Sequence, residues 1–300
     1  PKNSEISSIS EFLGGKILKF IFGMISILFF LLSTFMTTID FSTIIQKVYF
    51  SNFSIIYIIL FFIIATLTAN IIGLKSISRI NLLIIPFVIL AIIITFFSII
   101  LSEINIRNLI PIFGESYYKT FIIGLSNVSI MYNLSYILFL KPLIKEANEF
   151  KKICILSYLI SWMCVFLVII AISLLFNSVS VQSPANSVFL MVRVVSFGNF
   201  IERIDSLFIL LCVISVFNYL SFIIFFINRI IKKMFNITND KMLSFSTCSI
   251  LFALVLIPLS ISDLSFIENT IFRYSMIFYT FILEFIILLL ANIKKGVKKR

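Results

Sequence analysis

Long, unbroken runs of apolar residues constrain this chain more than any other feature of its sequence. One of them, SIIYIILFFIIATLTANII, fills residues 54–72 without a charged residue. An apolar stretch of about 20 residues can cross the hydrocarbon core of a bilayer as a helix. In lipid, only helices and closed barrels satisfy all of their backbone hydrogen bonds internally. Because barrel strands alternate apolar and polar residues and this run does not, the sequence predicts transmembrane helices.

Eight segments have this character, so we expect an all-α, polytopic transmembrane helix bundle that forms a single domain over residues 1–300. The predicted spans are residues 17–38, 54–73, 81–102, 119–140, 153–176, 204–228, 243–262 and 270–293. Two other stretches fit none of these spans. Residues 39–50 are predicted to continue the first span as an amphipathic helix, and residues 186–203 to lie as a helix in the outer interface.

The charged residues predict how the chain is oriented. Only 12% of the residues are charged, and the net charge is +11. With the N-terminal segment on the cytoplasmic side, the inner segments carry eighteen of the 24 Lys and Arg residues. Because basic loops stay cytoplasmic, both termini of this chain are expected in the cytoplasm. The same distribution explains the positive charge by contact with the lipid bilayer and argues against binding to nucleic acid.

The sequence offers no residue pattern that is typical of an enzyme. It contains no histidine, which removes the commonest general base and metal ligand. It also has no glycine-rich phosphate loop, nucleophile elbow or metal-spaced cluster. We therefore expect neither catalytic residues nor a metal site nor a cofactor.

Glu284 is the one clear charge within a predicted span. It lies ten residues before Lys294, which marks the inner end of that span. At about 1.5 Å per residue, Glu284 is then roughly 15 Å from that end and close to the membrane midplane. An ionisable residue at this depth indicates a functional site. Glu284 could bind a cation, carry a proton or pair with a substrate amine, or it could be a protonated carboxyl group that bonds a neighbouring helix.

The fourth span, residues 119–140, has the most polar interior. Gly124, Ser126, Asn127 and Ser129 are candidate ligand-binding residues, because Gly and Asn weaken a helix and a locally unwound helix exposes backbone groups to a ligand. The alternative is close helix packing, with Ser and Asn bonding between helices. Asn218 in the sixth span is a weaker candidate of the same kind.

Several stretches together resemble the B subunit of bacterial spore nutrient germinant receptors. They are EFLGGKILKF (11–20), NLIPIFGESYYKTFIIGL (108–125), FLKPLIKEANEFKK (139–152) and FIERIDSLFILLCVISVF (200–217). The last is similar to a Glu-Arg-x-Glu pattern of the family, with Asp205 in place of the second Glu. The resemblance runs over essentially the whole chain and depends on the order and spacing of the four stretches.

The resemblance implies a fold and a function. The family resembles the amino acid–polyamine–organocation transporters, whose ten spans form two inverted repeats of five. The eight spans of this chain would be the third to the tenth, so the chain would lack the first two. A spore inner-membrane protein is implied that senses a small-molecule nutrient such as an amino acid. It would act with an A-type membrane subunit and a C-type lipoprotein to trigger germination.

Two other functions remain open at the level of sequence. The chain could be an amino-acid or ion transporter of the same fold, with Glu284 as the coupling carboxylate. It could also be a scaffold or partner subunit with a vestigial pocket.

Overall fold

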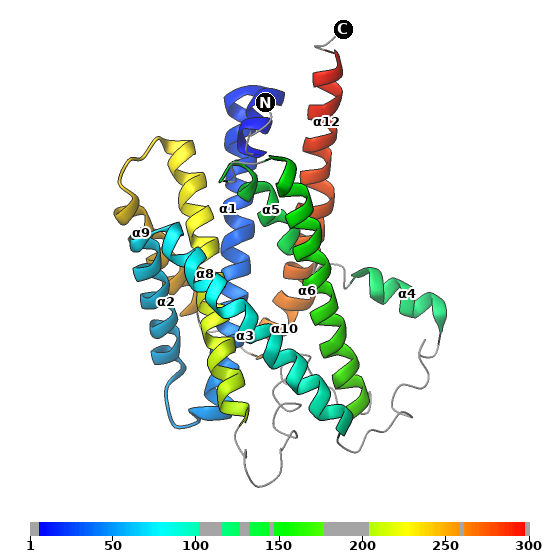
Figure 1. Ribbon diagram of the computed structural model, residues 1–300. Coiled ribbons are helices and arrows are strands. Elements are labelled where there is room, and N and C mark those ends of the chain that lie inside the picture. Colours follow the sequence, from blue (N-terminus) through cyan, green and yellow to red (C-terminus); the bar gives the residue numbers. More distant parts are fainter. Residues whose placement is uncertain are drawn as a thin grey trace. The chain divides into compact units, whose positions relative to one another are not determined.

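The computed structural model describes residues 6–101, 116–126, 132–143, 147–176, 204–257 and 261–297. Within these ranges all regular secondary structure is helical, which confirms the predicted all-α bundle (Figure 1). The described residues divide into two compact units. The prediction of a single transmembrane domain over residues 1–300 stays a prediction.

Unit 1 comprises residues 1–77, 124–151 and 219–300. Its first helix, α1 (Ile6–Tyr49), contacts α2 (Ile55–Ile72), α9 (Asp240–Val255) and α12 (Glu284–Val297). The shorter α5 (Leu134–Leu140), with the 3₁₀ turn η3 (Lys141–Leu143), and the second half of α8 (Ile204–Phe235) also belong to this unit. Its buried core is built largely from Phe and Ile side chains of α1 and α8.

The last helix of unit 1 runs without a break from residue 261 to residue 297. It consists of α10 (Ile261–Phe266), the π-helical η4 (Ile267–Phe272), α11 (Arg273–Ile277), the π-helical η5 (Phe278–Leu283) and α12. A π-helical turn bonds residue i to i+5 and is rare except as a short insertion, frequently at a functional site. Two such turns precede Glu284 in this helix.

Unit 2 comprises residues 78–123 and 152–218. It contains most of α3 (Leu74–Leu101), α4 (Tyr117–Ser126) and α6 (Ala147–Leu175), with the first half of α8. Its small core forms around Ala171, against which Phe96 and Phe208 pack. Many apolar side chains of α6 are exposed, including Trp162 and Phe166, as expected of a helix that faces lipid.

Six helices in the described part of the chain are long and apolar enough to cross a membrane. They cover Ser8–Val48, Ile55–Ile72, Leu74–Ile94, Glu149–Leu175, Phe208–Phe235 and Asp263–Lys294. These six correspond to six of the eight predicted spans, and the protein is a multi-pass membrane protein. The predicted span 119–140 is described as α4 and α5, with residues 127–131 outside the described ranges. The predicted span 243–262 corresponds to α9, which has 16 residues.

The two additional predicted segments have different outcomes. Residues 39–49 do continue the first span, because α1 is helical as far as Tyr49. The interfacial helix predicted for residues 186–203 falls outside the described residues.

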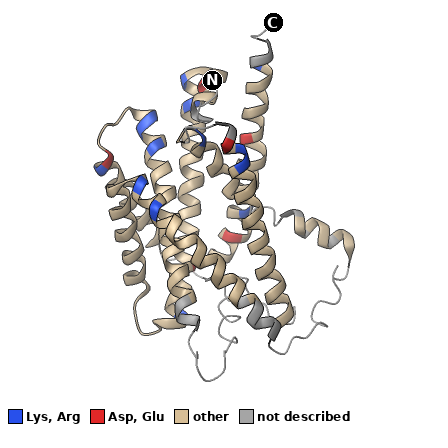
Figure 2. Cartoon of the chain, in the orientation of Figure 1, with Lys and Arg blue, Asp and Glu red and all other residues tan. Residues whose placement is uncertain are grey.

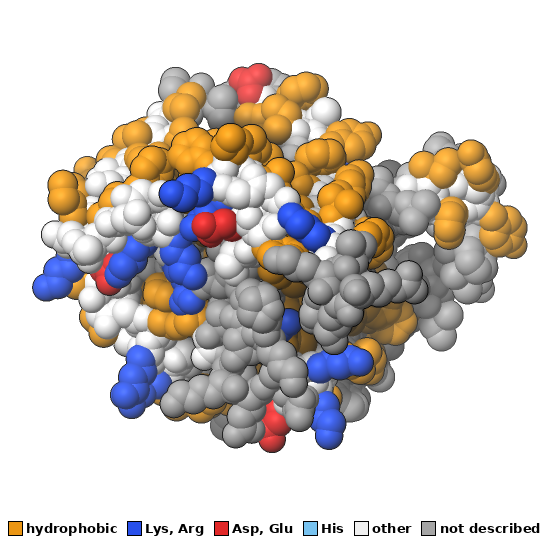
Figure 3. Space-filling model, turned by 90° about the horizontal axis from the view of Figure 1, so that it is seen from above, with side chains coloured by type: hydrophobic (Ala, Val, Ile, Leu, Met, Phe, Trp, Pro, Cys, Tyr) orange, Lys and Arg blue, Asp and Glu red, His pale blue; other side chains and the backbone are white. Residues whose placement is uncertain are grey.

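Basic residues of unit 1 gather where α1 begins and where α8 and α12 end (Figure 2). Lys294 of α12 donates hydrogen bonds of 2.8 and 2.9 Å to the backbone carbonyls of Phe12 and Leu13. Seen from above, Figure 3 shows Lys and Arg side chains on this end, with apolar side chains around them. The three helix termini therefore lie at the same end of unit 1, as the alternation of spans requires.

Candidate functional site

Glu284 is the first residue of α12 and lies inside unit 1. Only 3% of its surface is exposed, although it carries an ionisable carboxyl group. Its Oε1 atom is buried and has no hydrogen-bond partner among the described residues. A buried acceptor without a partner is unfavourable in an apolar environment, and such a residue in a membrane helix is typically functional.

Hydroxyl groups lie beside this carboxyl group and connect it to two other helices. Ser135 of α5 and Tyr279 of η5 lie beside it. The Ser135 hydroxyl is also 3.0 Å from the hydroxyl of Thr280. Tyr279 donates a 2.7 Å hydrogen bond to Ser26 of α1. We call these five residues the Glu284 cluster: Ser26, Ser135, Tyr279, Thr280 and Glu284.

The π-helical η5 explains how the last helix contributes three members to the cluster. Thr280 and Glu284 are four residues apart and share a face of an ordinary helix. Tyr279 is five residues before Glu284 and would lie on another side of a regular α-helix. In η5 the backbone bonds run from i to i+5, so the wider turn brings Tyr279 and Glu284 toward the same side.

A second group of hydroxyls lies in the same unit. Tyr219 of α8 is central, because its hydroxyl is 2.5 Å from Ser33, 2.7 Å from Tyr132 and 3.0 Å from Tyr136. Ser33 and Tyr136 also lie 3.3 Å apart. We call Ser33, Tyr132, Tyr136 and Tyr219 the tyrosine cluster. It joins α1, α5 and α8, which are far apart in the sequence.

Phe30 of α1 connects the two clusters. Its ring centroid lies 5.4 Å from that of Tyr136 and 6.3 Å from that of Tyr279. Phe29 stacks on Tyr279 with ring centroids 3.9 Å apart. These aromatic side chains pack between the two clusters and contact their tyrosine rings.

The combined arrangement provides a carboxyl group and several hydroxyls in an apolar interior. The carboxyl group can bind a cation or an ammonium group when it is ionised, and it can donate a hydrogen bond when it is protonated. The hydroxyl groups can donate or accept, so they suit a ligand that carries both polar and charged groups. Residues of this type within membrane helices line sites for substrates, ions or protons.

Among the predicted site residues that the structure describes, Glu284 alone lies in this arrangement. Gly124 is exposed on α4, and a Cβ atom there would meet nothing within 4 Å. Ser126 is the last residue of α4. Asn127 and Ser129 lie outside the described residues. Asn218 is buried on α8 in unit 2, and neither of its side-chain amide atoms has a partner among the described residues. Their role in ligand binding stays a prediction.

Sequence reasoning missed most members of the two clusters. The available signals were spacings: Ser26 and Ser33 are seven residues apart on α1, and Tyr132 and Tyr136 are four apart. Both spacings place side chains on one face of a helix. Thr34, Thr37 and Thr38, by contrast, bond carbonyls of their own helix, which fits a packing role.

One family of proteins, described as spore germination protein, has a model that matches residues 1–264. The match covers all four stretches that suggested a family from the sequence, and every cluster residue up to Tyr219. Tyr279, Thr280 and Glu284 lie beyond the matched residues. No curated protein and no solved structure matches the chain.

Proposed function

This chain belongs to the spore germination protein family, and on that basis we propose that it is a membrane subunit, of the B type, of a spore nutrient germinant receptor. In this proposal it senses a small nutrient, such as an amino acid, and triggers germination. It would lie in the spore inner membrane with both termini of this chain cytoplasmic, and act with an A-type membrane subunit and a C-type lipoprotein. Its fold would be related to that of the amino acid–polyamine–organocation transporters.

The observation that supports this proposal most directly is Glu284, buried with an unpaired oxygen atom inside a membrane helix. An amino acid has an ammonium group that an ionised Glu284 could bind. Its carboxylate needs hydrogen-bond donors, which the hydroxyl groups of Tyr132, Tyr136 and Tyr219 could supply.

Ligand binding at this place has a route to the rest of the protein. Tyr279 bonds α1 through Ser26, and Thr280 bonds α5 through Ser135. A ligand that bonds Glu284 would compete with these contacts and favour a different position of the last helix. A nutrient can shift such an equilibrium only through a difference in its affinity for the two states.

The test uses Glu284→Gln in the complete protein, expressed in spores that lack the native gene. Dipicolinate release is followed against nutrient concentration, with protein levels checked by immunoblot. We expect the half-maximal nutrient concentration to rise at least about tenfold, because a charge-assisted hydrogen bond contributes about 1.5–3 kcal/mol. Glu268→Gln is the matched control, since Glu268 is exposed in the same helix. Asn127→Leu tests the predicted site of the fourth span in the same assay. An unchanged response of Glu284→Gln spores at normal protein level would rule out the Glu284 cluster as the nutrient site.

The second candidate function is that of an amino-acid or ion transporter. Glu284 also supports this function, because a buried carboxyl group that binds and releases a cation or proton can couple ion flow to substrate movement. The complete protein in proteoliposomes would then concentrate a radiolabelled amino acid against its gradient, and Glu284→Gln would abolish that uptake. Ligand binding without any flux would favour the receptor.

A further inference from the structure

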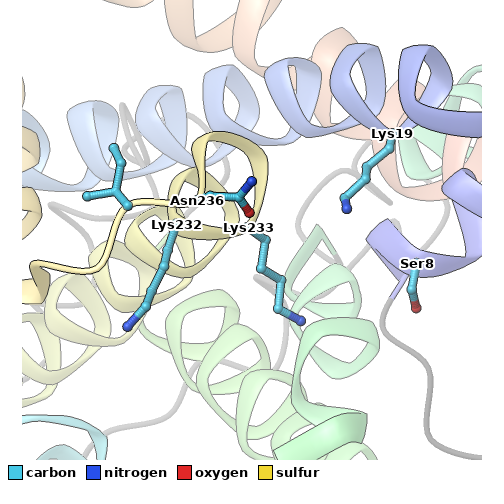
Figure 4. Close-up of a pocket in the computed structure, with 6 residues that line it drawn as sticks. Ser8, Lys19, Lys232, Lys233 and Asn236 are labelled. Carbon is cyan, nitrogen blue, oxygen red and sulfur yellow. The ribbon is translucent and has the colours of Figure 1, made fainter.

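A pocket of about 470 Å³ opens at the end of unit 1 where α1 begins and α8 ends. The described residues that line it are Ser8, Lys19, Lys232, Lys233, Asn236 and Ile237, and we call it the lysine pocket. None of them belongs to the Glu284 cluster or the tyrosine cluster. In Figure 4 the ammonium groups of Lys19 and Lys233 extend toward the same space, with Ser8 across from Lys19.

The pocket is a consequence of a sharp bend in α1. Gly14 and Gly15 have non-helical backbone angles, and Gly15 has φ +69° and ψ −160°. This combination is essentially confined to glycine. The bend turns the first residues of α1 back, and Lys294 anchors them through the carbonyls of Phe12 and Leu13. Ser8 therefore faces the end of α8 instead of extending away from it.

The lining of the pocket is strongly basic. Among the described residues its lining contains three lysines, Ser8 and Asn236, and no acidic residue. Two of the lysines have carboxylate partners outside the lining: Lys19 is 2.8 Å from Glu11, and Lys232 is 2.6 Å from Asp240. These carboxylates orient the two lysines, and an ammonium group has three N–H donors, so each lysine can bond a phosphate oxygen while it keeps its carboxylate partner.

Exposed apolar side chains lie next to the lysines in sequence. Phe20 follows Lys19 and is 46% exposed, and Phe235 is 54% exposed near the end of α8. Their ring centroids are 6.0 Å apart in an edge-to-face arrangement. Phe20 and Phe235 thus form an exposed apolar contact between the same two helices that carry the lysines.

We propose that this pocket binds the phosphate group of an anionic membrane phospholipid, whose acyl chains lie against Phe20 and Phe235. A soluble phosphate would use the lysines but gain nothing from the two phenylalanines. A lipid uses both, because basic pockets between membrane helices attract anionic head groups and apolar side chains contact the chains. The positive-inside distribution places this pocket at the inner leaflet.

The experiment measures lipid retained by the complete purified protein in native mass spectrometry, with phosphatidylglycerol and phosphatidylcholine added in turn. We expect phosphatidylglycerol to bind preferentially. Lys19→Gln and Lys233→Gln should each weaken its binding about fivefold, and the double variant about 30-fold. Lys241→Gln is the matched control, because Lys241 is exposed on α9 and does not line the pocket.

Two further variants separate loss of charge from loss of folding and test the contribution of Phe20. The pair Lys19→Arg with Lys233→Arg keeps both positive charges and should retain the lipid. Phe20→Ala should weaken phosphatidylglycerol binding without changing the binding of inorganic phosphate. Equal retention of phosphatidylcholine, or an equal loss in Lys241→Gln, would overturn the proposal. The proposal would also be overturned if the double Gln variant lost its binding of inorganic phosphate but retained phosphatidylglycerol as well as the unmodified protein does.

Discussion

Tyr279 donates a 2.7 Å hydrogen bond to Ser26, a residue 253 positions earlier in the chain. Ser26 in turn donates a 2.8 Å hydrogen bond to the carbonyl of Phe22 in its own helix. The bond therefore joins the last helix to α1 at a point where both side chains are buried. Because Tyr279 is also beside Glu284, the position of α1 and the surroundings of the carboxyl group depend on each other.

Replacing Tyr279 with Phe should lower the stability of the folded protein by about 1 kcal/mol, since the buried hydroxyl that bonds Ser26 is lost while Ser26 keeps its bond to Phe22. The measurement is thermal unfolding of the purified protein in detergent. Tyr274→Phe is the control, because Tyr274 is 63% exposed in the same helix. Equal effects of the two substitutions would show that the bond to Ser26 contributes nothing.

Within the tyrosine cluster, Tyr219→Phe should destabilise the protein more than Tyr132→Phe does. The Tyr219 hydroxyl lies within hydrogen-bonding distance of Ser33, Tyr132 and Tyr136, so its removal affects several buried groups. We expect a loss of about 1–3 kcal/mol. A double variant with Ser33→Ala should lose less than the sum of the two single losses, because the two hydroxyls share one network. Additive losses in chemical unfolding would contradict that coupling.

Alanine should have opposite effects at two glycines of this chain. At Gly15, with φ +69°, it should cost about 1–3 kcal/mol through backbone strain, although a Cβ atom there would meet nothing within 4 Å. At Gly124, inside α4, it should be neutral or stabilise by up to about 1 kcal/mol. Gly15→Ala should also reduce phosphatidylglycerol binding, because the bend that forms the lysine pocket is disturbed. Thermal unfolding and native mass spectrometry of both variants test this contrast.

The spans were predictable because lipid imposes one simple requirement on each helix: a long apolar run. Residues 54–72 illustrate this, since the described α2 matches the predicted span almost to the residue. Where the sequence is more polar, as in residues 119–140, the structure describes two shorter helices, α4 and α5. Residues 127–131 between them lie outside the described ranges. Hydropathy gives the length of an apolar segment but not whether one helix fills it.

The site was predictable only in part. Glu284 stood out because a charge within an apolar span is expensive. Tyr279 did not stand out, because its position beside Glu284 depends on the π-helical η5. No pattern in the residues FYTFIL predicts this π-helical segment. Ser33 and Tyr219 meet only through the packing of α1 against α8, 186 residues apart. A long-range contact of this kind leaves no signal in a single sequence.

The orientation in the membrane is the prediction that connects the lysine pocket to the inner leaflet. The turn after α8 contains Thr238, and the turn between α1 and α2 contains Ser51; both residues are exposed. With eighteen of the 24 basic residues in inner segments, Thr238 should face the cytoplasm and Ser51 the opposite side. After replacement of the four native cysteines, Ser51→Cys should react with an impermeant maleimide added to intact cells, and Thr238→Cys only after permeabilisation. The reverse pattern would place the lysine pocket in the outer leaflet and remove the physical reason for its basic lining.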